Sequence, residues 1–263
     1  MTLLDQDGVR LTLDGDAPDA SVATVTLANA AKRNAQDFAM WRALAEAGRL
    51  LPGGVRVVVL RGEGPSFSAG LDRRAFTPEG FEGEPSFMDL AAREDAGDAA
   101  IAEFQEAFTW FRRNDLISVA AVQGHAIGAG FQLALACDLR VCAEDAQFAM
   151  RETSLGLVPD LTGTHPLVGL VGYARALEIC VTGRLVRADE AERIGLANLV
   201  VPAADLDAAT RDLAAAVTAA PRDAVIETKA LLRGARDRTY DEQRAAERAA
   251  QGRRLRDLAG LAE

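Results

Sequence analysis

The sequence is poor in the residues that build metal sites and disulfides, with three cysteines and two histidines among 263 residues. Cys137, Cys142 and Cys180 are odd in number and follow no metal-binding spacing, and so few histidines argue against a zinc site. We therefore expect no metal, and we expect His125 and His165 to have structural roles. Unpaired cysteines also favour a reducing compartment, which predicts a cytoplasmic protein.

Long apolar runs and an excess of positive charge are also missing. No segment approaches the roughly 20 apolar residues that a membrane-spanning helix needs, and the opening MTLLDQDGVRL lacks the apolar stretch of a signal peptide. Lys and Arg total 29 against 39 Asp and Glu, which gives a net charge of −10. The chain as a whole therefore lacks the positive charge typical of nucleic-acid-binding proteins. We expect no membrane and no nucleic-acid partner.

Several catalytic and nucleotide-binding motifs are absent as well. The sequence contains no Gly-x-Ser-x-Gly elbow, which argues against a serine hydrolase. It contains neither a dinucleotide fingerprint nor a Gly-Lys-Ser/Thr phosphate loop. The acidic balance leaves an anionic ligand possible, because a few local Lys or Arg side chains can create a positive pocket.

What the sequence does contain is strand patterns alternating with helix patterns in its first part, and mostly helix patterns beyond residue 160. Apolar residues make up 49% of the chain, enough for a substantial core. These patterns predict an α/β core followed by a helical extension. The predicted strands are 9–13, 21–28, 55–62, 118–124 and 139–143, and the predicted helices are 36–50, 97–113, 166–182, 188–194, 203–219, 221–233 and 239–258. Residues 77–92 follow no period, which predicts a mobile loop over an apolar surface.

Two turns from a strand into a helix share a design, one at residues 68–72 and one at residues 128–132. Small residues there let a ligand approach the backbone, and a helix start leaves N–H groups unpaired. Two converging N–H groups would hold an oxyanion. Taken singly, each turn is better explained by close packing of helix on strand.

Several segments in a fixed order nevertheless resemble the crotonase family, the enoyl-CoA hydratase/isomerase superfamily. They are KRNA (32–35), SFSAGLD (66–72), QGHAIGAGFQLALACDLRV (123–141), AQFAMRETSLGLVPDLTGT (146–164), TGRLVRADEAERIGLANLVVP (182–202) and ETKALL (227–232). The resemblance implies a crotonase-like ββα spiral core over residues 1–200 with the acyl-CoA site, and a helical C-terminal oligomerisation region over residues 201–263. It implies a homotrimer or dimer of trimers, with a coenzyme A thioester as substrate and no cofactor.

The resemblance also assigns roles to residues of this chain. The backbone N–H groups of Leu71 and Ala129 would form an oxyanion hole for the thioester enolate. Glu152 matches the glutamate that family isomerases use to move a proton. Asp160 falls where dienoyl-CoA isomerases and a dehalogenase place an aspartate, whereas Gln132 replaces the second glutamate of the hydratases. An amide cannot transfer a proton at neutral pH, although it can orient water.

Three functions follow from these assignments. The leading one is double-bond isomerisation of an enoyl- or dienoyl-CoA by Glu152 with Asp160, both facing one acyl pocket whose apolar walls raise their pKa values. The second is hydration by Glu152 with a water oriented by Gln132, and the third is acyl-CoA binding without turnover. For Asp160, a structural role in a turn or as a cap of the helix near 163–171 stays open.

Substrate contacts are implied for a wider set of residues. Lys32 and Arg33 match a segment near the adenine and phosphates of coenzyme A, and Lys229 lies on a helix that in relatives can approach a neighbour's ligand. Each of these cations, taken alone, is better explained as a solvated charge. The full expected set is Lys32, Arg33, Ala69, Gly70, Asp72, Gly128, Phe131, Gln132 and Lys229. Acyl-chain specificity is expected from Phe131, Phe81, Phe87, Met88 and Trp110.

Overall fold

The molecule is built on a seven-stranded sheet in the order β1-β2-β3-β4-β5-β7-β10. The computed structural model describes residues 1–15, 19–84, 86–92 and 96–261. The strands of this sheet are β1 (Thr2–Gln6), β2 (Val9–Leu13), β3 (Val22–Leu27), β4 (Val57–Gly62), β5 (Ile117–Val122), β7 (Leu139–Ala143) and β10 (Leu199–Val201). The predicted strands in this set are confirmed to within two residues at each end.

The centre of the sheet is parallel and apolar. β4 pairs in parallel with both β3 and β5, and Val57, Val58 and Leu60 of β4 are buried. A parallel strand covered on both faces needs such a continuous apolar run, which is why the sequence predicts it well. Because β4 and β5 are parallel neighbours, the chain leaves both strands at the same edge of the sheet.

A second, three-stranded sheet stands at that edge. It consists of β6 (His125–Ile127), β8 (Gln147–Ala149) and β9 (Val186–Arg187), with β6 and β8 parallel. The chain passes from β5 of the first sheet into β6 of the second within three residues, and an isolated bridge joins Ser68 to Ala126. The two sheets thus bring the segment after β4 against the segment after β5.

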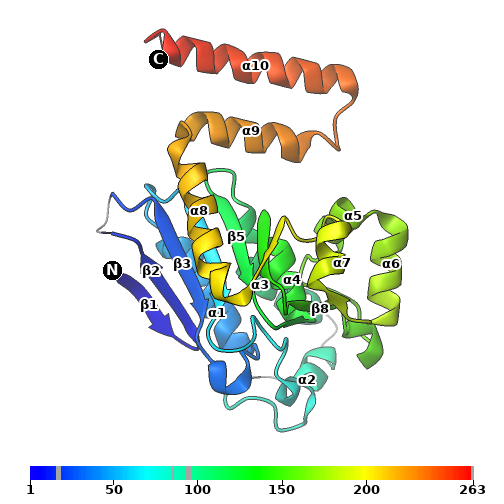
Figure 1. Ribbon diagram of the computed structural model, residues 1–263. Coiled ribbons are helices and arrows are strands. Elements are labelled where there is room, and N and C mark those ends of the chain that lie inside the picture. The colour runs from blue at the N-terminus through cyan, green and yellow to red at the C-terminus, as the bar shows by residue number, and fades with distance from the viewer. Residues whose placement is uncertain (16–18, 85, 93–95, 262–263) are drawn as a thin grey trace.

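Most of the helices lie on or beside these sheets, and the last two stand apart from them, as Figure 1 shows. They are α1 (Phe38–Leu50), α2 (Phe87–Ala91), α3 (Ala96–Thr109), α4 (Ala129–Ala136), α5 (Thr164–Val171), α6 (Tyr173–Thr182), α7 (Ala188–Arg193), α8 (Leu206–Ala219), α9 (Arg222–Gly234) and α10 (Tyr240–Leu258). Short 3₁₀ helices are η1 (Ala30–Lys32), η2 (Arg73–Phe76), η3 (Trp110–Arg112), η4 (Glu152–Leu155) and η5 (Ala203–Asp205). The single helix expected at 166–182 is divided by Gly172, whose φ of +78° ends α5.

An aromatic cluster between α1 and α3 holds the segment before α3. The ring of Phe104 stacks on Phe38 with centroids 4.6 Å apart, and Phe81 and Phe87 meet Phe38 edge to face. Ser86 forms a capping box with Asp89 at the start of α2. The apolar surface predicted beneath residues 77–92 is therefore present, while Pro85 lies outside the described residues.

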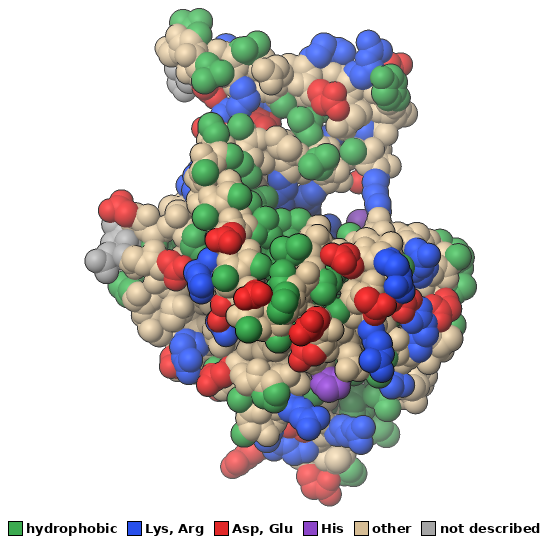
Figure 2. All heavy atoms as spheres, in the orientation of Figure 1, with side chains coloured by type: hydrophobic (Ala, Val, Ile, Leu, Met, Phe, Trp, Pro, Cys, Tyr) green, Lys and Arg blue, Asp and Glu red, His purple; other side chains and the backbone are tan. Residues whose placement is uncertain are grey.

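The part of the chain after β10 is helical and falls into two parts. α8 packs against β4, β5 and β7, where Leu206 and Ala214 join a separate apolar cluster on that face of the sheet. α9 and α10 lie beyond α8, away from the sheets, as an arm that stands off the body on one side (Figures 1 and 2). None of the helices in the described ranges is long and apolar enough to cross a membrane.

A buried lysine fastens this arm to the body. The Lys229 ammonium on α9 is 6% exposed, and it donates to Asp138 Oδ2 at 2.6 Å and to the main-chain oxygens of Arg113 and Leu116 at 2.6 and 2.7 Å. Burial lowers the pKa of Lys229. All three N–H donors of the ammonium are thus used within the chain.

Replacing Lys229 by Met should lower the free energy of unfolding by about 3 kcal/mol, because it leaves the Asp138 carboxylate largely buried without its partner. Chemical denaturation monitored by circular dichroism measures the change. Lys32→Met is the matched control, because its ammonium is 51% exposed in a long ion pair and should contribute less than about 1 kcal/mol. Equal losses in both variants would contradict the anchoring role.

Candidate active site

The first turn of the site is centred on Gly70, which follows β4. Its φ of +87° suits glycine, and a Cβ built there would lie 2.4 Å from the main-chain oxygen of Ile127 and 3.6 Å from Ala129 N. A Cβ never comes so close to another backbone atom, so only glycine permits this approach. The turn after β4 is therefore in backbone contact with the turn after β6.

Hydrogen bonds fix the direction of the Leu71 N–H in this turn. Gln36 N donates to Gly70 O at 2.8 Å, and Asp72 N donates to Gln36 O at 2.7 Å. Successive N–H groups of an extended backbone point to opposite sides. The Leu71 N–H therefore points away from Gln36, and the described residues offer it no acceptor.

The second turn starts α4 at Ala129. Gly128 has a φ of +52° and donates its N–H to Ala149 O, while its oxygen accepts from Gln132 N. The first N–H groups of a helix have no partner within it, so the Ala129 N–H is free to meet a ligand. A Cβ at Gly130 would lie 2.7 Å from Ser68 O. Close packing, one of the two alternatives offered by the sequence, is thus present, whereas convergence of the Leu71 and Ala129 N–H groups on a ligand stays a prediction.

Glu152 lies beside the second turn. It begins η4, and its Oε1 is 3.4 Å from the place of a Cβ on Gly128. Oε1 accepts a hydrogen bond from Gln132 Nε2 at 2.7 Å. Oε2 is buried, and no group of the described residues hydrogen-bonds to it. One oxygen of this carboxylate is therefore tied to the protein and the other is not.

Burial raises the pKa of the Glu152 carboxyl above its usual range, and the charge of Asp160 adds to this rise. The hydrogen bond from Gln132 acts in the opposite direction, since it favours the ionised form. Burial likewise raises the pKa of Asp160. Both directions agree with the predicted rise, whereas the acyl pocket expected to cause it stays a prediction.

Asp160 lies in the turn that leads to α5. Its main-chain oxygen accepts from Gln105 Nε2 at 2.6 Å, which holds the turn against α3. The N-cap of α5 is Gly163, and no side chain caps that helix. The alternative in which Asp160 caps the helix is therefore wrong. The half-buried carboxylate is left close enough to Glu152 to influence its pKa.

Two residues of α4 that are expected at the substrate are buried and contact protein groups. Gln132 is fully buried, with its oxygen accepting from Leu161 N at 2.9 Å and Gly163 N at 3.3 Å. These contacts are with protein, and a contact of Gln132 with substrate or water stays a prediction. Phe131 is also fully buried and packs on Phe148 with centroids 5.2 Å apart. Its acyl contact stays a prediction.

Some of the other aromatic and apolar residues expected at the acyl pocket pack on the core, and one is exposed. Phe81 and Phe87 pack on the apolar core, whereas Met88 is 68% exposed. Trp110 stacks on Phe111 with centroids 3.8 Å apart. None of these contacts by itself defines the length of an acyl pocket.

A charged rim adjoins the first turn. Lys32 Nζ is 3.5 Å from Asp72 Oδ2, and the guanidinium of Arg74 also donates to Asp72, which lowers the pKa of that carboxyl. Arg33 is exposed, and its main-chain oxygen accepts from Ala69 N at 2.8 Å. The structure thus joins the KRNA segment to the turn at Gly70. It does not bring in the Lys229 ammonium, whose donors are all used in anchoring α9.

Sequence reasoning missed Asn34 and Gln105. Asn34 is fully buried, and its Nδ2 donates to the main-chain oxygens of Glu63, Ser66 and Phe67, which shapes the segment before the first turn. Its place in the KRNA segment was the available signal. Gln105 gave none, because its acceptor Asp160 lies 55 residues away.

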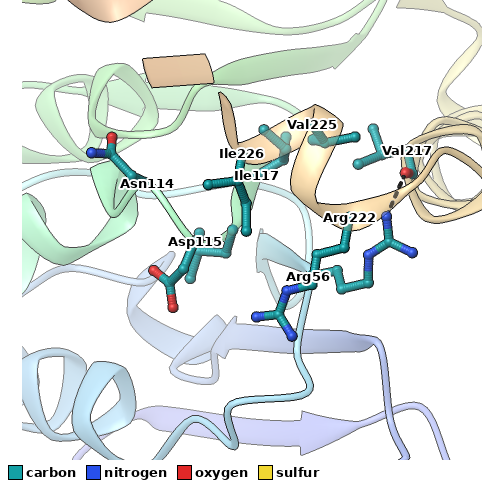
Figure 3. Close-up of a pocket in the computed structure, with 9 residues that line it drawn as sticks. Arg56, Asn114, Asp115, Ile117, Val217, Arg222, Val225 and Ile226 are labelled. Atoms are coloured by element: carbon teal, nitrogen blue, oxygen red, sulfur yellow. Dashed lines mark hydrogen bonds between the residues drawn. The ribbon is translucent and has the colours of Figure 1, made fainter. Parts of the chain in front are cut away.

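Two hollows lie away from this site. One of about 10 Å³ sits between the start of β5 and the junction of α8 with α9, where Arg56 donates to main-chain oxygens at the end of α8, including Val217 (Figure 3). It has room for about one water molecule. The other, of about 410 Å³, lies between α8 and the sheet near Arg61 and Asp207. The candidate carboxylates line neither of them.

Comparisons with known proteins connect this geometry to a family. The family described as enoyl-CoA hydratase/isomerase matches residues 18–257. Carnitinyl-CoA dehydratase from Salmonella typhi is 37% identical over 189 residues, which covers 72% of this chain and 67% of that protein.

Solved structures agree with this match. A candidate enoyl-CoA hydratase from Thermobifida fusca YX, in complex with CoA, is 48% identical with a TM-score of 0.89, covering 96% of this chain and 95% of the other. A candidate enoyl-CoA hydratase from Thermobifida fusca YX, in complex with acetoacetyl-CoA, is 49% identical with a TM-score of 0.89, covering 95% of each chain. Enoyl-CoA hydratase from Bacillus anthracis is 26% identical with a TM-score of 0.78, covering 95% of this chain and 94% of the other.

Gly70→Ala should disrupt the contact between the two turns and destabilise the protein by more than about 3 kcal/mol, as expected for a backbone clash. Gly83→Ala is the matched control, since Gly83 has a similar φ of +77° but no described atom within 4 Å of a Cβ there. That variant should lose about 1 kcal/mol from the left-handed conformation alone. Thermal unfolding measures both, and similar losses would argue against the close approach.

Proposed function

Because the chain belongs to the enoyl-CoA hydratase/isomerase family, and so has the crotonase fold and acts on acyl-CoA thioesters, we propose that it moves a double bond in an enoyl- or dienoyl-CoA. The observation that carries this proposal is the carboxylate of Glu152, whose Oε2 has no hydrogen-bond partner among the described residues. Position 132, where the hydratases have a second glutamate, is Gln132. A single carboxylate is enough to move a proton between two carbons of one substrate.

The two turns supply the electrostatic part of the mechanism. The Leu71 and Ala129 N–H groups hold the thioester oxygen, where negative charge develops when the proton on C2 leaves. Each such donor stabilises the transition state by about 3–4 kcal/mol. The enolate is therefore accessible from a thioester whose C2 proton is otherwise weakly acidic.

Glu152 supplies the proton transfer. Its ionised form takes the proton from C2 of a 3-enoyl-CoA through Oε2, and the protonated carboxyl can exchange that proton with solvent. The C2–C3 double bond forms as the electrons of the enolate return, and the carboxyl delivers a proton to C4. In a dienoyl-CoA the proton is needed farther along the chain, and Asp160 acts there as the second acid or base. The raised pKa of both groups suits this exchange of protons.

The charged rim is the proposed site for the coenzyme. Lys32 and Arg33 are exposed beside the first turn, where cations can attract the phosphates of coenzyme A. The Thermobifida fusca structures with CoA and acetoacetyl-CoA support an acyl-CoA ligand. We also propose assembly as a trimer or a dimer of trimers, with α9 and α10 contributing to the contacts.

Hydration or dehydration is the second candidate, because carnitinyl-CoA dehydratase is 37% identical to this chain. Glu152 alone would then activate or release the water. Gln132 is poorly placed to help, since both lone pairs of its oxygen accept main-chain N–H groups.

Mass spectrometry in heavy water separates these functions. A 2-enoyl-CoA, a 3-enoyl-CoA and a 3,5-dienoyl-CoA are each incubated with the protein. Deuterium incorporation with a shifted double bond and no added water supports isomerisation. Addition of water to the 2-enoyl-CoA supports the second candidate, and unchanged masses for all three substrates contradict both.

Glu152→Gln should reduce proton exchange at C2 by about a hundredfold to ten-thousandfold, because it removes the group that accepts the proton. Binding of the acyl-CoA, followed by calorimetry, should change little. Glu192→Gln on the exposed face of α7 serves as the control and should keep full activity. Exchange at the wild-type rate in Glu152→Gln would remove Glu152 from the mechanism.

The rate of isomerisation should increase with pH through the pKa of Glu152, because only the ionised carboxylate can accept the C2 proton. Burial raises that pKa, so the acidic limb of the pH–rate profile should lie above the value of about 4.3 for an ordinary glutamate. Steady-state rates between pH 4 and 9 measure it. A rate that is already maximal at about pH 4.3 would contradict the raised pKa.

A further inference from the structure

We propose that Gln132 is a positioning residue that holds Glu152 in place for proton transfer and fixes the turn that carries Asp160. This inference rests on the function proposed above, since it assigns Glu152 as the base. The contacts that carry it join three segments that are distant in sequence: α4, η4 and the turn before α5.

The direction of the Gln132 amide is fixed by its partners. Its oxygen accepts two main-chain N–H groups, from Leu161 at 2.9 Å and Gly163 at 3.3 Å. Only an oxygen can accept from two N–H donors, so the –NH₂ group must face the other way. There it donates to Glu152 Oε1 at 2.7 Å. A flipped amide would lose all three hydrogen bonds.

This contact makes the two oxygens of Glu152 unequal. Oε1 is held by Gln132, while Oε2 is buried with no partner among the described residues. The held oxygen fixes the rotation of the carboxylate, and the other oxygen is the one available to a substrate proton. A glutamate at position 132 could not hold Oε1 in this way, because an ionised carboxylate has no hydrogen to donate.

The same side chain shapes the turn around Asp160. A Cβ at Gly163 would lie 2.8 Å from Gln132 Cγ, so the turn fits against the glutamine only because residue 163 is glycine. Thr162 adopts a φ of +68°, which is uncommon for a threonine. From the other side, Gln105 holds the main-chain oxygen of Asp160. Two glutamines therefore clamp the turn, and only Gln132 also touches Glu152.

The effect of Gln132 on Glu152 should be visible in the pH dependence. The described titratable groups that influence or are influenced by Glu152 are Asp160 and Cys180, on the turn and on α6. Both residues stay in the chain when Gln132 is substituted, and Gln132→Glu also keeps an acceptor for the turn that carries Asp160. Loss of the N–H donor removes a contact that favours ionised Glu152, so the acidic limb of the pH–rate profile should move to higher pH.

The test compares Gln132→Met, Gln132→Glu and Gln105→Met with the wild type. In Gln132→Met, kcat for double-bond isomerisation should fall about tenfold to a hundredfold, as for loss of a hydrogen bond to a charged group. KM should stay within a small factor, and the acidic limb should move up. Gln132→Glu keeps an acceptor for the two main-chain N–H groups, and its added negative charge should move the limb farther. Gln105 does not hydrogen-bond to Glu152, so in Gln105→Met the acidic limb of the pH–rate profile should stay at the wild-type pH.

Gln243→Met on α10 is the control for the substitution itself, because its side chain bonds to Arg238 and Glu247, away from Glu152, and it should keep the wild-type kcat and acidic limb. Wild-type kcat and an unmoved acidic limb in both Gln132 variants would overturn the positioning role. If Gln132→Met does not fold, the pH–rate profile of Gln132→Glu alone tests the positioning role, which requires its acidic limb to move to higher pH. Wild-type exchange in Glu152→Gln would instead contradict the proposed function, so the two failures are distinguishable.

Discussion

The backbone contact between the turn at Gly70 and the turn at Ile127–Ala129 is the constraint on which the rest of the site depends. It requires two neighbouring parallel strands, β4 and β5, that end at one edge of the sheet, and a residue without a side chain at position 70. Where the turns meet, the place of a Cβ on Gly70 is 3.6 Å from Ala129 N. In the proposed mechanism the Leu71 and Ala129 N–H groups beside this contact hold the thioester oxygen.

Helix α4 links the contact between the two turns to Glu152 and to the arm of α9 and α10. Its residues are all buried, its first N–H is the proposed oxyanion donor, and Gln132 in its first turn donates a hydrogen bond to Glu152. Just after its last turn, Asp138 binds Lys229 and fastens the arm of α9 and α10. The helix therefore connects the chemistry at one end to the anchoring of the arm at the other. Burial makes both ends sensitive to charge, since it raises the pKa of Glu152 and lowers that of Lys229.

Sequence patterns predicted the parts of this fold that are set by local chemistry. Continuous apolar runs identified β4 and β7, and glycines between small residues identified both turns. Strands β6, β8, β9 and β10 have three residues or fewer and are ordered by their neighbours, so no periodic pattern marks them. The roles of Gln132 and Lys229 were also out of reach, because their partners lie 20 to 31 and 91 to 116 residues away. Which side of α4 faces Glu152 depends on those distant contacts.

A crystal structure of the protein with acetoacetyl-CoA tests the central claim most directly. The thioester oxygen should lie about 2.7–3.1 Å from both Leu71 N and Ala129 N. C2 of the ligand should face Glu152 Oε2, while Oε1 keeps its hydrogen bond from Gln132. A thioester oxygen bound by any other group, or a C2 atom on the far side from Glu152, would contradict the account.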